Sequence, residues 1–132
     1  MSVAVHTFKD LEFAKWARKE RVADAMLCKA VAEIEAGLID ARPGGSLLKK
    51  RVAAPGRGKS GGWRTMLATN LRDRWVFLYG FAKNERDNVD DEELRTLKLL
   101  AQTYLGLDEE GIDRLVEAGE LTEVRDGEPE TA

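Results

Sequence analysis

The run from Trp75 to Ala82 places the strongest constraint on how this chain can fold. Its residues, Trp-Val-Phe-Leu-Tyr-Gly-Phe-Ala, carry no charge and are apolar at both alternating sets of positions. Successive side chains of a strand point to opposite faces of a sheet, so a strand of this kind needs cover on both faces. We therefore predict a central, doubly covered β-strand over residues 75–82.

The rest of the chain predicts an α+β fold. Apolar residues at helical spacing, interrupted at residues 19–21, predict two helices near the N-terminus, with Asp10 as an N-cap and Gly37 as a left-handed C-cap. Asp90 and Glu93 form a capping-box pattern before a later helix. The expected elements are a strand at 3–8, helices at 10–18 and 22–36, an antiparallel meander at 47–53, 63–71 and 75–82, and two helices that end at Gly106 and Gly119. Together these give two N-terminal helices packed on a mainly antiparallel four-stranded sheet, followed by C-terminal helices.

Length and composition limit the function classes. The 132 residues fit one domain, and they contain one cysteine, Cys28, and one histidine, His6. An internal disulfide and a Cys/His zinc site are therefore excluded, and we expect no metal and no cofactor. We expect Cys28 to pack as a small apolar residue and His6 to be a structural or surface residue. The sequence has no secretory signal pattern and no apolar run long enough to cross a membrane, which predicts a cytoplasmic protein without membrane contact.

Charge is distributed unevenly along the chain. Residues 42–86 hold eleven Lys and Arg against two acidic residues, whereas residues 108–132 hold two against ten. A basic middle in a chain of net charge −3 indicates a site for a polyanion. The alternative is that these cations are scattered over the surface.

The segment Ala53-Ala-Pro-Gly-Arg-Gly-Lys59-Ser60 nearly matches a phosphate-binding P-loop, with alanine in place of the first glycine. That mechanism needs a helix directly after the loop, so that backbone amides point at the phosphates. Here Gly61, Gly62 and a strand pattern follow instead. The sequence therefore argues against a nucleotide hydrolase.

The basic residues are instead predicted to converge at one end of the meander. Alternation in the strand 47–53 puts Lys49 and Arg51 on one face, and Leu48, Lys50 and Val52 on the other. Arg64 lies on the neighbouring strand, Arg57 and Lys59 lie on the loop between the two, and Lys83 and Arg86 follow the central strand. Trp63 and Tyr79 could stack on a base, although core packing is the more common role for such residues.

These residues, in this order, resemble the RelE/ParE toxins of bacterial type II toxin–antitoxin systems. The resemblance is carried by Leu47-x-Lys49-x-Arg51, the string from Gly58 to Arg64, and the string from Phe81 to Arg86. It covers about residues 3–104 and is closest to the RelE-like and HigB-like mRNA interferase branch. It implies a RelE-like fold, with a toxin domain at 1–107 and an acidic helical extension with a flexible tail at 108–132.

The resemblance implies an endoribonuclease that cuts translated mRNA on the ribosome without a metal. The ribose 2′-hydroxyl attacks the adjacent phosphate and leaves a 2′,3′-cyclic phosphate and a 5′-hydroxyl. Arg64 would stabilise the phosphate, Lys49 and Arg51 would orient it or act as base, and Lys59 would be base or phosphate contact. The expected RNA-binding residues are Arg57, Lys83, Arg86 and Trp63. The implied partners are the ribosome, mRNA and a helix-turn-helix antitoxin, with operator DNA bound only through the antitoxin complex.

The sequence departs from the family pattern in three places. It lacks the histidines of some HigB toxins, since His6 is on the first predicted strand. Asn84 stands where RelE has an arginine, and Asp90 or an acidic helix start stands where it has a C-terminal tyrosine, so the general acid is not identified. Two alternatives therefore stay open: a ParE-like inhibitor of DNA gyrase, and a protein of the same fold that binds RNA or its partner without cleavage. The acidic segment 108–132 could cover the basic groove as a nucleic-acid mimic, help bind the antitoxin, or be a solvated surface helix and tail.

Overall fold

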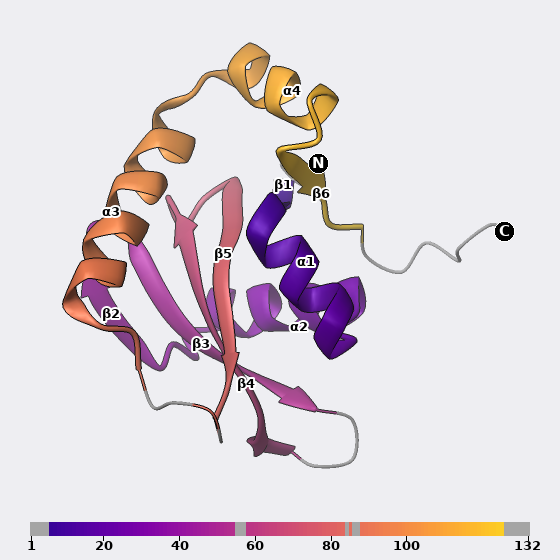
Figure 1. Ribbon diagram of the computed structural model, residues 1–132, viewed down its shortest axis with the longest axis vertical. Coiled ribbons are helices and arrows are strands. Elements are labelled where there is room, and N and C mark those ends of the chain that lie inside the picture. Colours follow the sequence, from indigo (N-terminus) through magenta and orange to yellow (C-terminus); the bar gives the residue numbers. More distant parts are fainter. Residues whose placement is uncertain (1–5, 55–57, 84, 86–87, 126–132) are drawn as a thin grey trace, which may run out of the picture.

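A computed structural model describes residues 6–54, 58–83, 85 and 88–125, without the side chains of residues 58–60. The elements follow the order βααββββααβ (Figure 1). They are β1 (His6–Asp10), α1 (Leu11–Glu20), α2 (Asp24–Glu35), β2 (Ala41–Gly44), β3 (Leu47–Ala54), β4 (Gly58–Thr69), β5 (Arg74–Ala82), α3 (Asp91–Gly106), α4 (Glu109–Glu117) and β6 (Leu121–Glu123).

The strands form one six-stranded sheet in the order β2-β3-β4-β5-β1-β6. The β1–β5 pair is parallel and the other four pairs are antiparallel, so the α+β class and the mainly antiparallel sheet are confirmed. The predicted number of four strands is wrong, because β2 pairs with β3 and β6 pairs with β1. Both added strands are short, and β2 contains Pro43 and Gly44, which are typical of a connection rather than a strand.

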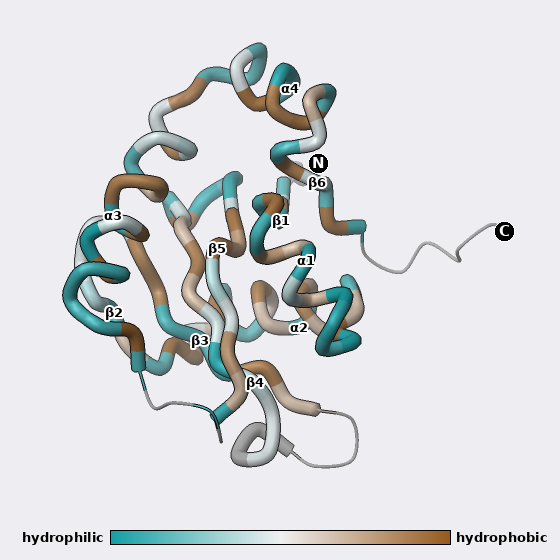
Figure 2. Tube along the Cα trace, in the orientation of Figure 1, coloured by the Kyte–Doolittle hydropathy of each residue, from teal (hydrophilic) through white to brown (hydrophobic). Residues whose placement is uncertain are grey.

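Both faces of the sheet are covered. The α1 and α2 face buries Phe13, Leu27, Trp75 and Phe77 among others, and the opposite face packs Val76, Leu78, Leu97 and Ala101. The central strand β5 therefore lies between two apolar layers, as predicted. The expected arrangement of two helices on the sheet is incomplete, because α3 covers the second face. Figure 2 shows hydrophobic and hydrophilic segments alternating along α3 and α4, as expected for helices with one buried side.

Local sequence patterns correctly predicted where several helices begin or end. The Asp10 carboxylate accepts a hydrogen bond from the backbone N–H of Phe13 at 2.8 Å and caps α1. Asp90 and Glu93 form the predicted capping box at the start of α3. Gly37, after α2, has a φ of +93°, which a residue without Cβ adopts at little cost. Burial raises the pKa of Asp10 to about 6, despite the backbone hydrogen bond, which opposes that rise.

The acidic C-terminal segment joins the same fold through residue 125. Ile112 and Leu121 pack in the α3-side core, and Val124 packs in the other core. Because β6 pairs with β1, this segment lies at the edge of the sheet remote from β3 (Figure 1). The idea that it covers the basic groove is therefore wrong for residues 108–125, and the predicted disorder of 126–132 lies outside the described residues. The division at residue 107 stays a prediction from sequence.

Candidate nucleic-acid interface

Strand pairing brings three of the predicted basic residues onto one face of the sheet. Arg51 on β3 lies directly opposite Arg64 on β4, and Lys49 lies two residues before Arg51 on the same face. The neighbouring Leu48 and Val52 pack in the α1/α2 core, so Lys49 and Arg51 point to the α3 side. We call Lys49, Arg51 and Arg64 the basic cluster.

The two arginines of the basic cluster differ in their ion pairing with the described residues. Arg51 Nε lies 3.6 Å from Asp40 Oδ1, and the Arg51 side chain is 48% exposed. For Arg64, no carboxylate among the described residues lies within ion-pair distance. Like charges directly opposite each other on a sheet destabilise it by roughly 0.2–1 kcal/mol. This end of the sheet therefore attracts anions.

Lys50 lies between the cluster residues in sequence but on the opposite face. Its side chain is 2% exposed, and its Nζ lies 2.8 Å from Glu33 Oε1 on α2. The same ammonium group donates a hydrogen bond to the carbonyl of Leu38 at 3.0 Å. The charge of Lys50 is thus balanced inside the fold by Glu33. Lys49 and Arg51 are the cations of β3 that point to the α3 side.

A β-bulge in β5 turns two aromatic residues toward the basic cluster. Met66 pairs with Tyr79, whereas the next residue, Leu67, pairs with Phe77, so Leu78 is an extra residue in β5. Arg64 consequently lies opposite Phe81 on the same face, and the rings of Tyr79 and Phe81 lie 6.0 Å apart. Simple alternation from Trp75 would place both rings on the α1/α2 face.

The start of α3 meets the basic cluster through polar contacts. Lys49 Nζ donates a hydrogen bond to Asn88 Oδ1 at 3.4 Å, and Tyr79 Oη donates one to Glu93 Oε2 at 3.2 Å. The other oxygen of Glu93 accepts the backbone N–H of Asp90 at 2.9 Å. Sequence reasoning used Glu93 only as a helix cap and missed its contact with the sheet, since that contact depends on the bulge.

The structure does not bring every predicted site residue together. Trp63 lies on the α1/α2 face, where its Nε1 donates a hydrogen bond to Glu20 Oε1 at 3.1 Å, so it is separated from the basic cluster by the sheet. Lys83 is exposed in the turn after β5. The side chains of Arg57, Lys59 and Arg86, and Asn84 as a whole, lie outside the described residues. Lys59 itself belongs to β4, so the segment after the loop is a strand and not the helix of a P-loop.

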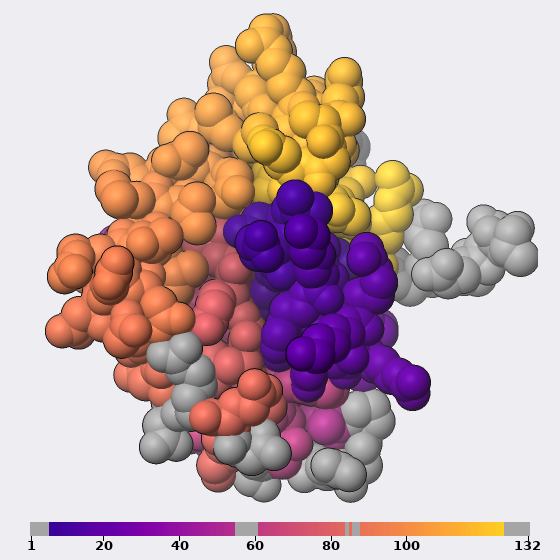
Figure 3. All heavy atoms as spheres, in the orientation of Figure 1, coloured from indigo at the N-terminus to yellow at the C-terminus, as the bar shows by residue number. Residues whose placement is uncertain are grey.

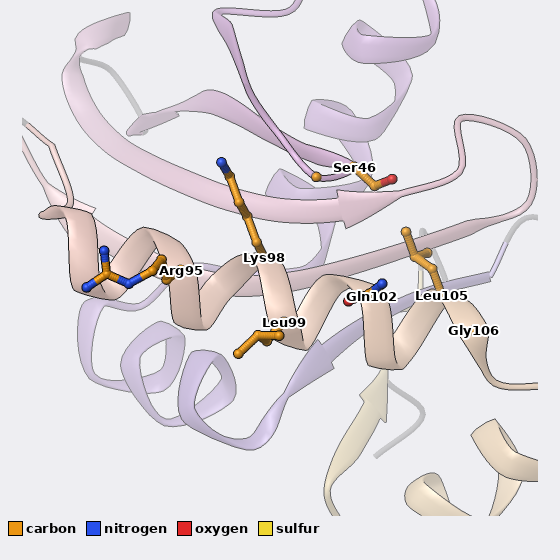
Figure 4. A pocket seen from close by; sticks show the side chains of 8 residues that line it. Ser46, Arg95, Lys98, Leu99, Gln102, Leu105 and Gly106 are labelled. Carbon is orange, nitrogen blue, oxygen red and sulfur yellow. The ribbon is translucent and has the colours of Figure 1, made fainter.

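A separate cavity of about 630 Å³ lies farther along α3, beside the turn between β2 and β3. Figure 4 shows Lys98 extending from α3 toward this turn, which carries Ser46. The lining also includes Arg95, Leu99, Gln102 and Leu105. Figure 3 shows the outer surface of α3 beside a band of sheet residues and α1.

The described residues contain no group of three or more His, Cys, Asp or Glu side chains that could hold a metal ion. Within the same part of the chain, no helix is both long enough and apolar enough to span a membrane. The chemistry that the cluster itself can perform is binding an anionic group and stabilising negative charge.

Comparison with known proteins identifies the family. The family model described as the RelE toxin of the RelE / RelB toxin-antitoxin system matches residues 5–124. The chain therefore belongs to the RelE toxin family, and the predicted relationship to RelE/ParE toxins is confirmed. It is a toxin of a toxin–antitoxin system, a class whose members are generally endoribonucleases that inhibit translation and have a cognate antitoxin. A search of curated proteins found no match.

Proposed function

We propose that this toxin is a ribosome-dependent endoribonuclease that cleaves translated mRNA in the cytoplasm without a metal ion. The observation that carries the proposal is the direct pairing of Arg51 with Arg64, with Lys49 on the same face. A fold that holds like charges opposite each other is stabilised when a polyanion binds between them. A phosphodiester is such an anion, and its charge increases in the transition state of 2′-hydroxyl attack.

In this proposal Arg64 and Arg51 bind the scissile phosphate and Lys49 orients it. Arg57, Lys83 and Arg86, which lie between strands or helices along the chain, contact the RNA backbone. Lys59, at the start of β4, does the same and is also a candidate for the base. Such contacts fix position more than sequence, so codon choice would come mainly from the ribosome. A helix-turn-helix antitoxin is the proposed inhibitor, and operator DNA is bound through its complex.

Growth and mRNA integrity after induced expression test the proposal. Wild-type protein is expected to arrest growth and to produce cuts inside translated messages, and Arg64→Ala is expected to lose both effects. Arg72→Ala is the matched control, because Arg72 is exposed in the β4–β5 turn at the other end of these strands and should keep full activity. Growth arrest with intact mRNA would instead favour a gyrase inhibitor, and absence of arrest would favour a binding protein without nuclease activity.

A further inference from the structure

The candidate site contains a second chemical group beside its cations. Lys49 pairs with Met66 across β3 and β4, and Met66 pairs with Tyr79 across β4 and β5. These three residues form one row across the sheet, next to the row of Arg51, Arg64 and Phe81. Strands are spaced about 4.8 Å apart, so the backbones of Lys49 and Tyr79 are about 10 Å apart. Met66, which is fully buried, lies between them in this row.

The hydrogen bonds of Tyr79 have the direction that removal of a proton requires. The Tyr79 hydroxyl donates to Glu93 Oε2, and a phenolic oxygen that donates can still accept a hydrogen bond. Glu93 is held in place because its other oxygen accepts the backbone N–H of Asp90. A hydroxyl that approaches Tyr79 from the sheet face would thus meet an acceptor whose own proton already points at a carboxylate.

We propose that Tyr79 and Glu93 form a proton relay that activates the ribose 2′-hydroxyl, an inference that rests on the proposed nuclease function. The 2′-hydroxyl gives its proton to Tyr79 Oη while Tyr79 passes its own proton to Glu93 Oε2. The 2′-oxygen bonds to phosphorus, the bond from phosphorus to the 5′-oxygen breaks, and the leaving oxygen takes a proton from water. Glu93 then returns its proton to solvent. In this assignment Tyr79 is a catalytic residue, and Glu93 acts through it as the terminal base.

Two conservative variants test the relay with little change to the fold. Tyr79→Phe keeps the ring beside Phe81 and removes the hydroxyl. Glu93→Gln keeps an acceptor for the backbone N–H of Asp90, since glutamine also completes a capping box, and removes the basic oxygen. Tyr104→Phe is the control, because Tyr104 is the other tyrosine and lies near the far end of α3.

The measurement is the single-turnover cleavage rate of a synthetic mRNA on programmed ribosomes, recorded with the full chain from pH 5 to 9. We expect each relay variant to cleave at least ~10²-fold more slowly, the typical contribution of general acid–base catalysis. The double variant should be no slower than either single variant, because both interrupt one path. Ribosome binding should be unchanged. The wild-type rate should decrease at acidic pH, and Glu93→Gln should lose this decrease.

Each outcome decides the proposal. Cleavage by Tyr79→Phe within about threefold of wild type, at unchanged binding, would overturn the relay while the nuclease function stands. A slow Glu93→Gln variant with the pH profile of wild type would also overturn it, because Glu93 would then have only a structural role. If wild-type protein cuts no RNA on ribosomes, the proposed nuclease function itself fails. The two substitutions alter different elements, so misfolding of one variant leaves the other as the test.

Discussion

Substitution of Lys50 tests whether this cation of β3 stabilises the fold, unlike its neighbours Lys49 and Arg51 in the basic cluster. Lys50→Met keeps most of the apolar stem and removes the ammonium group. Removing one partner of a buried ion pair costs about 3–5 kcal/mol, because the remaining charge loses its partner. That partner, Glu33, has a side chain that is 19% exposed and can regain some water, so we expect a loss of about 2–3 kcal/mol in the free energy of unfolding. The unfolding entropy of a chain this long converts the loss to about 7–11 °C in Tm.

Urea unfolding followed by circular dichroism measures this difference. The control is Lys49→Met, one residue earlier, whose side chain is half-buried on the other face and contacts Asn88. We expect that variant to unfold within about 0.5 kcal/mol of wild type, as is usual for surface substitutions. The double variant Glu33→Leu/Lys50→Met should recover at least half of the lost stability, because no charge remains without its partner.

Two results would refute this reasoning. Equal losses in the Lys50 and Lys49 variants would mean that the buried ion pair contributes nothing particular to folding. A double variant as unstable as the sum of its single variants would mean that Lys50 and Glu33 are not coupled. In either case the stability data would not support a structural role for Lys50 that differs from the roles of Lys49 and Arg51.

Three further predictions concern stability. Because the pKa of Asp10 is about 6 in the fold against 3.8 ordinarily, its neutral form stabilises the protein fully below pH 4, and this contribution is lost as pH rises through 6. Asp10→Asn should therefore match wild type at pH 4 and exceed it by about 2–3 kcal/mol at pH 7.5 in urea unfolding; a constant difference would contradict this. Gly62→Ala should lower Tm by several degrees, since its Cβ would lie 2.0 Å from the Val52 carbonyl oxygen, whereas Gly106→Ala, with open space around it, should not. Arg64→Gln should leave the free energy of unfolding unchanged or raise it by up to about 1 kcal/mol, because the substitution removes a like-charge contact. This gain should be smaller at high salt. A clear loss of stability would argue against repulsion at this pair.

Local patterns made part of the fold and of the site predictable. The apolar run of β5 and the caps at Asp10 and Asp90 depend on neighbouring residues, and all were predicted correctly. The shared face of Lys49 and Arg51 follows from alternation within one strand. The position of Arg64 beside these two residues was predictable because β3 and β4 form a hairpin, in which strand pairing follows from chain order.

The parts that were missed depend on contacts between distant segments. Strand β2 exists through its pairing with β3 despite Pro43, and β6 exists through its pairing with β1. The bulge at Leu78 leaves no mark in an all-apolar run, so neither the direction of Tyr79 nor its contact with Glu93 could be predicted. Trp63 was grouped with the RNA-binding residues because it is an aromatic residue within the basic region. It is adjacent to Arg64, however, and adjacent residues of a strand point to opposite faces.

The position of β1 in the sheet has a consequence for folding during synthesis of the chain. This strand is the first along the described chain, yet it lies between β5 and β6 and pairs Phe8 with Glu123. Such distant pairing slows folding, because the intervening chain must be brought together first. During synthesis β1 has neither neighbour until β5 has left the ribosome, and its second neighbour forms only after residue 123 has been made. The complete sheet therefore arises late in translation, so the toxin can reach its folded state only after residue 123 has been made.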